Sequence, residues 1–244
     1  LKVLARFGLA PDTSDLRVRD LDTRSLSAVV KQRFQNFAPS PEAPTLFGFT
    51  ATPERTDKRG LEWIFDGVVF SRTILEMMEA GWLCSIQGQR ISTISDISDV
   101  KVRAGEFAPQ ELSERVNTTE RNALAVSAYL QYAKGRQALA FAVDVAHANA
   151  LYAAFIGANI STGLVVGNTR HDARSDTIQQ YHEGKLNVLV NCMVLTEGFN
   201  DPNTSCIIMA RPTKSQLLYT QMLGRGTRIH PDKSYLLVID LVDV

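Results

Sequence analysis

The sequence predicts an α/β protein whose larger part is a doubly wound parallel sheet. From residue 117 onward, short apolar segments alternate regularly with helical segments. The apolar segments have almost no polar positions, as expected of strands that are covered on both faces of a parallel sheet. The helical segments between them are long enough for right-handed crossovers. In such sheets ligands bind beyond the carboxyl ends of the strands, so we expect functional residues in the loops that follow them.

The elements of this larger part can be assigned in chain order. The first is a helix over 120–135, which Thr118 or Thr119 can cap and which Gly135 ends. After it, strands are predicted at 138–143, 161–167, 187–191, 205–210 and 235–242, and helices at 145–158, 173–184 and 215–224. His147 lies near the start of the second helix, where packing or capping is favoured over a catalytic role.

The first 116 residues have a less regular pattern. Polar residues dominate up to residue 45, and strands are predicted at 46–49 and 67–70, with helices at 60–66 and 72–82. Alternating residues after Cys84 indicate an extended strand followed by a linker that reaches about Arg115. These changes of pattern divide the chain into the segments 1–83, 84–118 and 119–244.

The composition excludes several classes of protein. Apolar residues make up 45% and charged residues 21% of the chain, and the net charge is zero. No apolar run approaches the roughly 20 residues of a membrane span, and the first residues do not fit a signal peptide, so we expect a cytoplasmic protein without a membrane partner. The cysteines are widely scattered and the histidines have no partner at a metal-like spacing, so no metal site is predicted. Because the charge is balanced in both halves, any contact with nucleic acid must come from local clusters.

The strongest chemical signal lies at residues 221–228, where the last predicted helix ends. Arg225 and Arg228 stand three residues apart, beside Gly224 and Gly226. A guanidinium binds phosphate through two hydrogen bonds and keeps its charge, which suits it to phosphoryl transfer. The glycines allow close approach of the backbone. The alternative is that both arginines lie in solvent and offset the dipole of the helix.

Residues 221–228 fit the pattern Q-x-x-G-R-x-x-R of motif VI of superfamily 2 helicases. Other segments resemble motifs of that family in the same order: 48–53 motif III, 138–147 motif IV, 166–169 the backbone-contacting loop after it, and 195–202 motif V. The resemblance begins near residue 46 and is greatest to the bacterial DEAD/DEAH-box branch related to XPB and to restriction subunits. It implies a RecA-like C-terminal lobe over 119–244, a linker over 84–118, and the end of a first RecA-like, ATP-binding lobe over 1–83.

The resemblance also implies roles for single residues. Arg225 and Arg228 would be catalytic arginine fingers on the γ-phosphate of ATP. Asn200 stands where the family usually has an aspartate that contacts the ribose. Taken singly, the threonine hydroxyls are equally suited to capping loops. The implied nucleotide-binding residues are Gln221, Gly224, Gly198, Asn200 and Asp201, and the implied nucleic-acid or coupling residues are Thr50, Thr52, Thr169 and Thr196.

Two parts of an ATPase site do not occur in the sequence. There is no G-x-x-x-x-G-K-[ST] loop and no acidic D-E-x-H tetrad, which together would hold the phosphates, Mg²⁺ and the attacking water. The resemblance places both upstream of residue 1. We therefore expect ATP and Mg²⁺ as cofactors of a longer ATP-dependent helicase, and no hydrolysis by this chain alone. The expected partners are the missing N-terminal lobe and a nucleic acid, with DNA favoured over RNA.

Three alternatives belong to other functional classes. A dinucleotide-binding dehydrogenase would need a G-x-G-x-x-G turn after a strand, whereas the glycines at 224–226 follow a helix. A non-hydrolysing scaffold that only binds nucleic acid is favoured by Asn200 and by the missing first half. A restriction-type translocase, which moves on duplex DNA without unwinding it, would share all of these motifs.

Overall fold

The computed structural model describes residues 46–50, 65, 67–103, 105–195 and 199–243. The chain divides into two units, Leu1–Ser71 and Arg72–Val244. Residues 46–49 and 67–70, for which we predicted strands, do not form strands. Apolar side chains alone do not make a strand, because its backbone groups need a hydrogen-bonded neighbour. The predicted helix at 60–66 lies outside the described residues, apart from Phe65.

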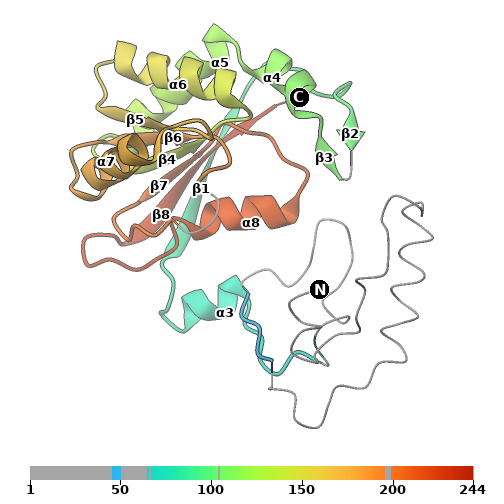
Figure 1. Ribbon diagram of the computed structural model, residues 1–244, viewed down its shortest axis with the longest axis vertical. Helices are drawn as coiled ribbons and strands as arrows, with labels where there is room; N and C mark the ends of the chain where they lie inside the picture. Colours follow the sequence, from blue (N-terminus) through green and yellow to red (C-terminus); the bar gives the residue numbers. More distant parts are fainter. Residues whose placement is uncertain (1–45, 51–64, 66, 104, 196–198, 244) are drawn as a thin grey trace. The chain divides into compact units, whose positions relative to one another are not determined.

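The second unit is built on a six-stranded parallel sheet with the strand order β1-β8-β7-β4-β6-β5 (Figure 1). The strands are β1 Ser85–Ser92, β4 Ala138–Phe141, β5 Thr162–Val165, β6 Val188–Asn191, β7 Cys206–Met209 and β8 Tyr235–Val242. The helices are α3 Ile74–Glu79, α4 Pro109–Val116, α5 Thr119–Ala128, α6 Val145–Gly157, α7 His171–His182 and α8 Gln216–Gly224, and α5 continues as the π-helix η1 Tyr129–Ala133. A short antiparallel pair, β2 Val102–Arg103 and β3 Glu106–Phe107, precedes α4.

Alternate residues of the central strands pack on opposite faces of the sheet. On one face, Ala138 and Ala140 of β4 join a core with residues of α5 and α6. On the other face, Leu139 and Phe141 join a core with residues of α7 and α8. The strands are therefore buried on both sides, as their apolar sequences predict, and the helices cover the sheet in two layers (Figure 1).

Strand β1 is an edge strand that pairs with β8 along its whole length, from Ser85 beside Tyr235 to Ser92 beside Val242. We predicted an extended strand here but assigned residues 84–118 to a linker. The structure instead places the first part of this segment in the sheet, and the boundary between the units falls after Ser71. Every residue of β1 is exposed or half-buried, and β1 lacks the continuous apolar pattern of the central strands.

Local signals in the sequence set several helix ends. Thr118 Oγ1 accepts a hydrogen bond from Arg121 N at 3.2 Å and caps α5, as predicted. Gly81 and Gly135 follow α3 and η1 with φ angles of 75° and 84°, a conformation that favours glycine. Among the described residues, no helix is long and apolar enough to cross a membrane.

Candidate functional site

Residues 221–224 form the last turn of helix α8, and residues 225–228 follow it in the connection to β8. Ser215 Oγ accepts a hydrogen bond from Leu218 N at 3.2 Å and caps the helix, and Leu218 is buried against the sheet. After the helix the chain passes Gly226, where an added β-carbon would collide with the side chain of Leu236. Glycine is therefore required at this position by the close approach of the backbone to the core.

Backbone carbonyls hold the two arginines of this segment. Arg225 Nη1 donates to Phe199 O at 2.8 Å, and Arg228 Nη1 donates to Gly224 O at 3.5 Å. Both arginines are partly exposed. Gly224 has open space around its α-carbon, so packing does not require glycine there. The structure thus places both cations after α8 and joins Arg225 to the segment that begins at Phe199.

Lys233, which our sequence analysis did not single out, connects the same two segments. Its Nζ donates to Pro202 O at 2.9 Å and to Thr204 O and Gly226 O, both at 3.0 Å. Lys233 is 8% exposed, and burial lowers the pKa of its ammonium group. Its partners are backbone carbonyls, one in its own loop and two in the loop before β7, so no side-chain pattern in the sequence marks it.

Asp201 faces the interior of the unit. It is 1% exposed, its Oδ1 accepts a hydrogen bond from Asn203 N at 3.0 Å, and its Oδ2 lies 3.1 Å from His182 Nδ1. Its carboxylate stabilises the loop, and the contact with the nucleotide that we predicted for Asp201 stays a prediction. The ring of His182 also stacks on Phe199, with centroids 5.6 Å apart and an interplanar angle of 8°. Asn200, by contrast, is exposed.

Of the residues predicted to contact nucleic acid, the structure describes Thr50 and Thr169. Thr169 Oγ1 accepts a hydrogen bond from Val166 N at 2.9 Å and closes the loop between β5 and α7, which is the capping role. A hydroxyl that accepts one hydrogen bond can still donate another, so its contact with a phosphate stays a prediction. Thr50 is exposed and belongs to the first unit. The residues that lie outside the described part of the chain are Thr52, Thr196 and Gly198.

Comparisons with known proteins identify the family. Residues 121–230 match the family described as helicase conserved C-terminal domain. The chain is 40% identical over 200 residues to the "Putative ATP-dependent helicase IRC3" of Saccharomyces cerevisiae, which covers 81% of this chain and 29% of that protein. This chain carries the C-terminal portion of a superfamily 2 helicase.

Two further similarities are to subunits of type I restriction enzymes. The type I restriction enzyme EcoKI endonuclease subunit of Escherichia coli is 33% identical over 85 residues, which cover 33% of this chain and 7% of that protein. A fragment structure from Vibrio vulnificus, described as a "putative HsdR subunit of a type I restriction enzyme", has a TM-score of 0.65 at 21% identity, over 79% of this chain and 38% of that one. The predicted RecA-like fold of a helicase C-terminal lobe is confirmed.

The helicase match contains the segments that resemble motifs IV, V and VI, whereas residues 48–53 lie outside it. The chain spans less than a third of the length of the yeast relative that it matches. We call residues Arg72–Val244 the helicase lobe from here on.

Within the described residues, no three His, Cys, Asp or Glu side chains gather where they could hold a metal ion.

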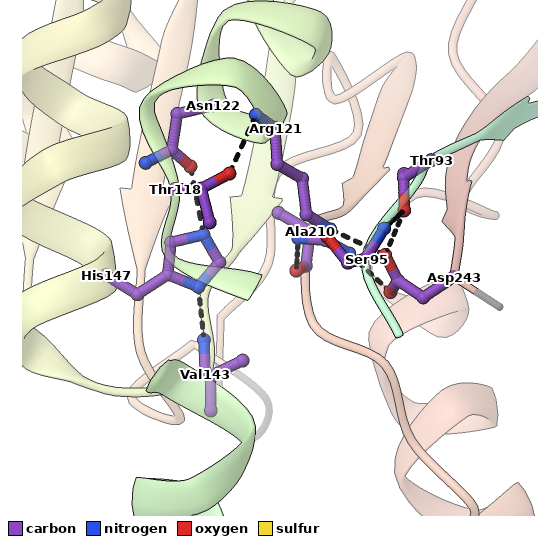
Figure 2. Close-up of polar contacts among 9 residues, drawn as sticks. All are labelled: Thr93, Ser95, Thr118, Arg121, Asn122, Val143, His147, Ala210 and Asp243. Carbon is purple, nitrogen blue, oxygen red and sulfur yellow. Dashed lines mark hydrogen bonds and ion pairs between the residues drawn. The ribbon is translucent and has the colours of Figure 1, made fainter. Parts of the chain in front are cut away.

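His147 is a packing residue of the helicase lobe. It is fully buried, its Nδ1 accepts a hydrogen bond from Val143 N at 3.2 Å, and its Nε2 lies 3.1 Å from Asn122 Oδ1 (Figure 2). Burial, with a smaller contribution from the charge of Arg121, lowers its pKa to about 4. The ring is therefore neutral near pH 7 and carries its hydrogen on Nε2, which donates to Asn122. The predicted packing role is confirmed.

A buried ion pair ties three strand ends of the helicase lobe to α5 (Figure 2). Arg121 Nε and Nη2 donate to the two carboxylate oxygens of Asp243 at 2.8 Å each, and Nη1 donates to Ala210 O at 2.7 Å. Thr93 Oγ1 donates to Asp243 Oδ1 at 2.5 Å. Because Thr93, Ala210 and Asp243 follow β1, β7 and β8, this network lies at the carboxyl edge of the sheet.

Proposed function

We propose that the intact parent of this chain is an ATP-dependent motor on nucleic acid, and that the helicase lobe supplies the arginines of its ATPase site. The observation that carries the proposal is the hydrogen bond of 2.8 Å from Arg225 Nη1 to Phe199 O. It joins the segment that resembles motif VI to the segment that resembles motif V. The similarity to a protein named as an ATP-dependent helicase supports the same activity.

The chemistry of this segment fits a polyphosphate. Within the described part of the chain, the side chain of Arg228 makes one hydrogen bond, 3.5 Å long, so most of its donors can turn to an anion. ATP supplies the phosphoryl group that is transferred to water. Arg225 and Arg228 would bind the γ-phosphate and stabilise the charge that develops there. Gln221 on α8 would orient the nucleotide, and the exposed Asn200 would contact the ribose.

The first lobe would complete this site with the residues that bind Mg²⁺ and the attacking water, and closure of the two lobes would bring the arginines to the phosphates. We propose that the nucleic acid lies across loops that include Thr169 and Thr196. DNA is favoured over RNA, because one relative is a subunit of a restriction endonuclease. Cytoplasmic location remains our expectation for the parent.

ATP hydrolysis by the intact parent tests the arginine assignment. We expect R225A and R228A each to lower kcat at least ~100-fold, as measured for arginine fingers in other enzymes. The matched control is R115A, which removes an exposed arginine of α4 in the same lobe. Wild-type turnover in both R225A and R228A would contradict the assignment.

A second assay separates the motor from its alternatives. The intact parent is given single-stranded DNA, duplex DNA and RNA in turn, and ATP turnover is recorded with strand displacement. Stimulation by one polymer identifies it as the track. Stimulation by duplex DNA without strand separation indicates a restriction-type translocase. A parent that binds a polymer but does not hydrolyse ATP would be a non-hydrolysing scaffold, and this result would contradict the proposed motor function.

A further inference from the structure

We propose that Lys233 is a positioning residue for Arg225: its ammonium group fixes the two backbone segments between which the arginine is held. The inference rests on the proposed function, because it concerns the same ATPase site. It assigns to Lys233 a role in turnover that goes beyond packing.

The hydrogen bonds of Lys233 and Arg225 join the same two segments. Lys233 Nζ bridges Gly226 O on one segment to Pro202 O and Thr204 O on the other, with distances of 2.9–3.0 Å. Arg225 directly precedes Gly226, and it donates to Phe199 O, three residues before Pro202. Lys233 therefore determines the distance between Phe199 O, which accepts the hydrogen bond of Arg225, and the backbone of Arg225.

The side chain at this position suits such a clamp. Lysine is a compact charge with three donors that can point in three directions, whereas the five donors of arginine lie in one plane. Within the described residues, no carboxylate forms an ion pair with Lys233, so its hydrogen bonds all go to carbonyl oxygens, while the charge of Asp201 acts on it without direct contact. A buried cation is a poor device for stability alone, because its desolvation offsets much of what its contacts contribute. We therefore infer that its use here is geometric.

Loss of the clamp would move Arg225 rather than remove it. A displacement of about 1 Å at a catalytic group can cost ~100-fold in rate. The expected effect is on kcat, with little change in KM for ATP, because the first lobe is expected to supply most contacts to the nucleotide. A merely structural lysine would instead lower thermal stability and leave turnover per folded molecule unchanged.

A double-mutant cycle on the intact parent tests the inference. Steady-state ATP hydrolysis is measured for the wild type, K233M, R225A and the double mutant, each corrected for folded fraction by thermal unfolding. We expect K233M to lower kcat about tenfold or more, with KM for ATP changed less than ~3-fold. In the R225A background, K233M should change kcat less than ~2-fold, because a residue that acts through Arg225 has nothing left to position.

The outcomes separate this inference from the proposed function. Wild-type turnover in R225A overturns the inference, and wild-type turnover in R228A as well overturns the proposed function with it. A normal loss in R225A that multiplies with the loss in K233M overturns only the positioning role, as does wild-type kcat in folded K233M. The control is K185M, which replaces an exposed lysine that pairs with Glu183. If K233M does not fold, K233R takes its place in the same cycle, and we expect at least a ~3-fold loss of kcat that disappears in R225A.

Discussion

Two buried cations hold opposite edges of the helicase lobe, and they are compensated in different ways. At the carboxyl edge, Arg121 forms a two-pronged ion pair with Asp243, and both side chains are at most 2% exposed. At the amino edge, before β8, Lys233 donates to three backbone carbonyls and forms no ion pair with any carboxylate among the described residues. The ion pair of Arg121 connects strand ends through a carboxylate, and Lys233 connects two loops through hydrogen bonds to backbone carbonyls. We infer that the carboxyl edge contributes more to stability and that the amino edge sets the geometry of the arginines.

The largest expected effect on stability is the loss of the ion pair between Arg121 and Asp243. In D243A, the guanidinium of Arg121 stays buried without its carboxylate, and removal of one partner of a buried pair costs about 3–5 kcal/mol. We expect this loss in the free energy of unfolding of the full chain, measured with urea. The control is D172A, which removes an exposed pair with Arg170 and should change stability little. Equal losses of unfolding free energy in D243A and D172A would show that the buried ion pair does not stabilise the carboxyl edge.

Acid should destabilise the carboxyl edge through His147, whose ring contacts Asn122 beside Arg121. The pKa of His147 falls from its ordinary value of 6.5 to about 4 in the folded chain, so the unfolded chain binds the proton more tightly. The contribution of the neutral ring is fully present above pH 6.5 and is lost as the pH falls towards 4, by up to about 3 kcal/mol.

Urea unfolding at several pH values between 7 and 4 measures this loss. The wild type should lose stability more steeply than H147N over that window. The exposed His171 provides the control, because H171N should keep the wild-type slope. A wild-type slope in H147N would show that other groups cause the acid sensitivity.

Removal of the charge of Lys233 should lower stability less than removal of the carboxylate of Asp243. K233M leaves three carbonyls without their shared donor but also removes a buried charge, so we expect a loss of about 1–3 kcal/mol. Urea unfolding of the full chain, side by side with D243A, gives the ranking. A loss in K233M as large as that in D243A would mean that both edges depend equally on their cations.

The sequence predicted the central sheet well because the strands are apolar on both faces, and the helix ends because Thr118 and the glycines act locally. It failed at residues 46–49 and 67–70, where apolar side chains do not form strands. It also did not place β1 in the sheet, because an edge strand has exposed positions and its partner β8 lies some 150 residues further along the chain.

The candidate site was only partly predictable for a similar reason. Gly226 and the two arginines belong to one local pattern, which the sequence displays directly. Lys233 contacts backbone carbonyls in its own loop and in the loop before β7. Every residue has such a carbonyl, so no residue type in the sequence marks these contacts. Asp201 was assigned to the nucleotide from its position in a motif, but its burial beside His182 depends on how the loop folds.

The smallest expected effect concerns the helix that presents Arg121 to the ion pair. Thr118 Oγ1 accepts the hydrogen bond from Arg121 N, so the cap and the cation belong to the same turn. T118A should cost about 1 kcal/mol of unfolding free energy, as for other threonine caps. T119A is the matched control, because Thr119 is exposed and is the first residue of α5 rather than its cap. If the cap acts by positioning Arg121, T118A should cost clearly less in the D243A background, where the guanidinium has lost its partner. Equal losses in both backgrounds would show that the cap stabilises α5 alone.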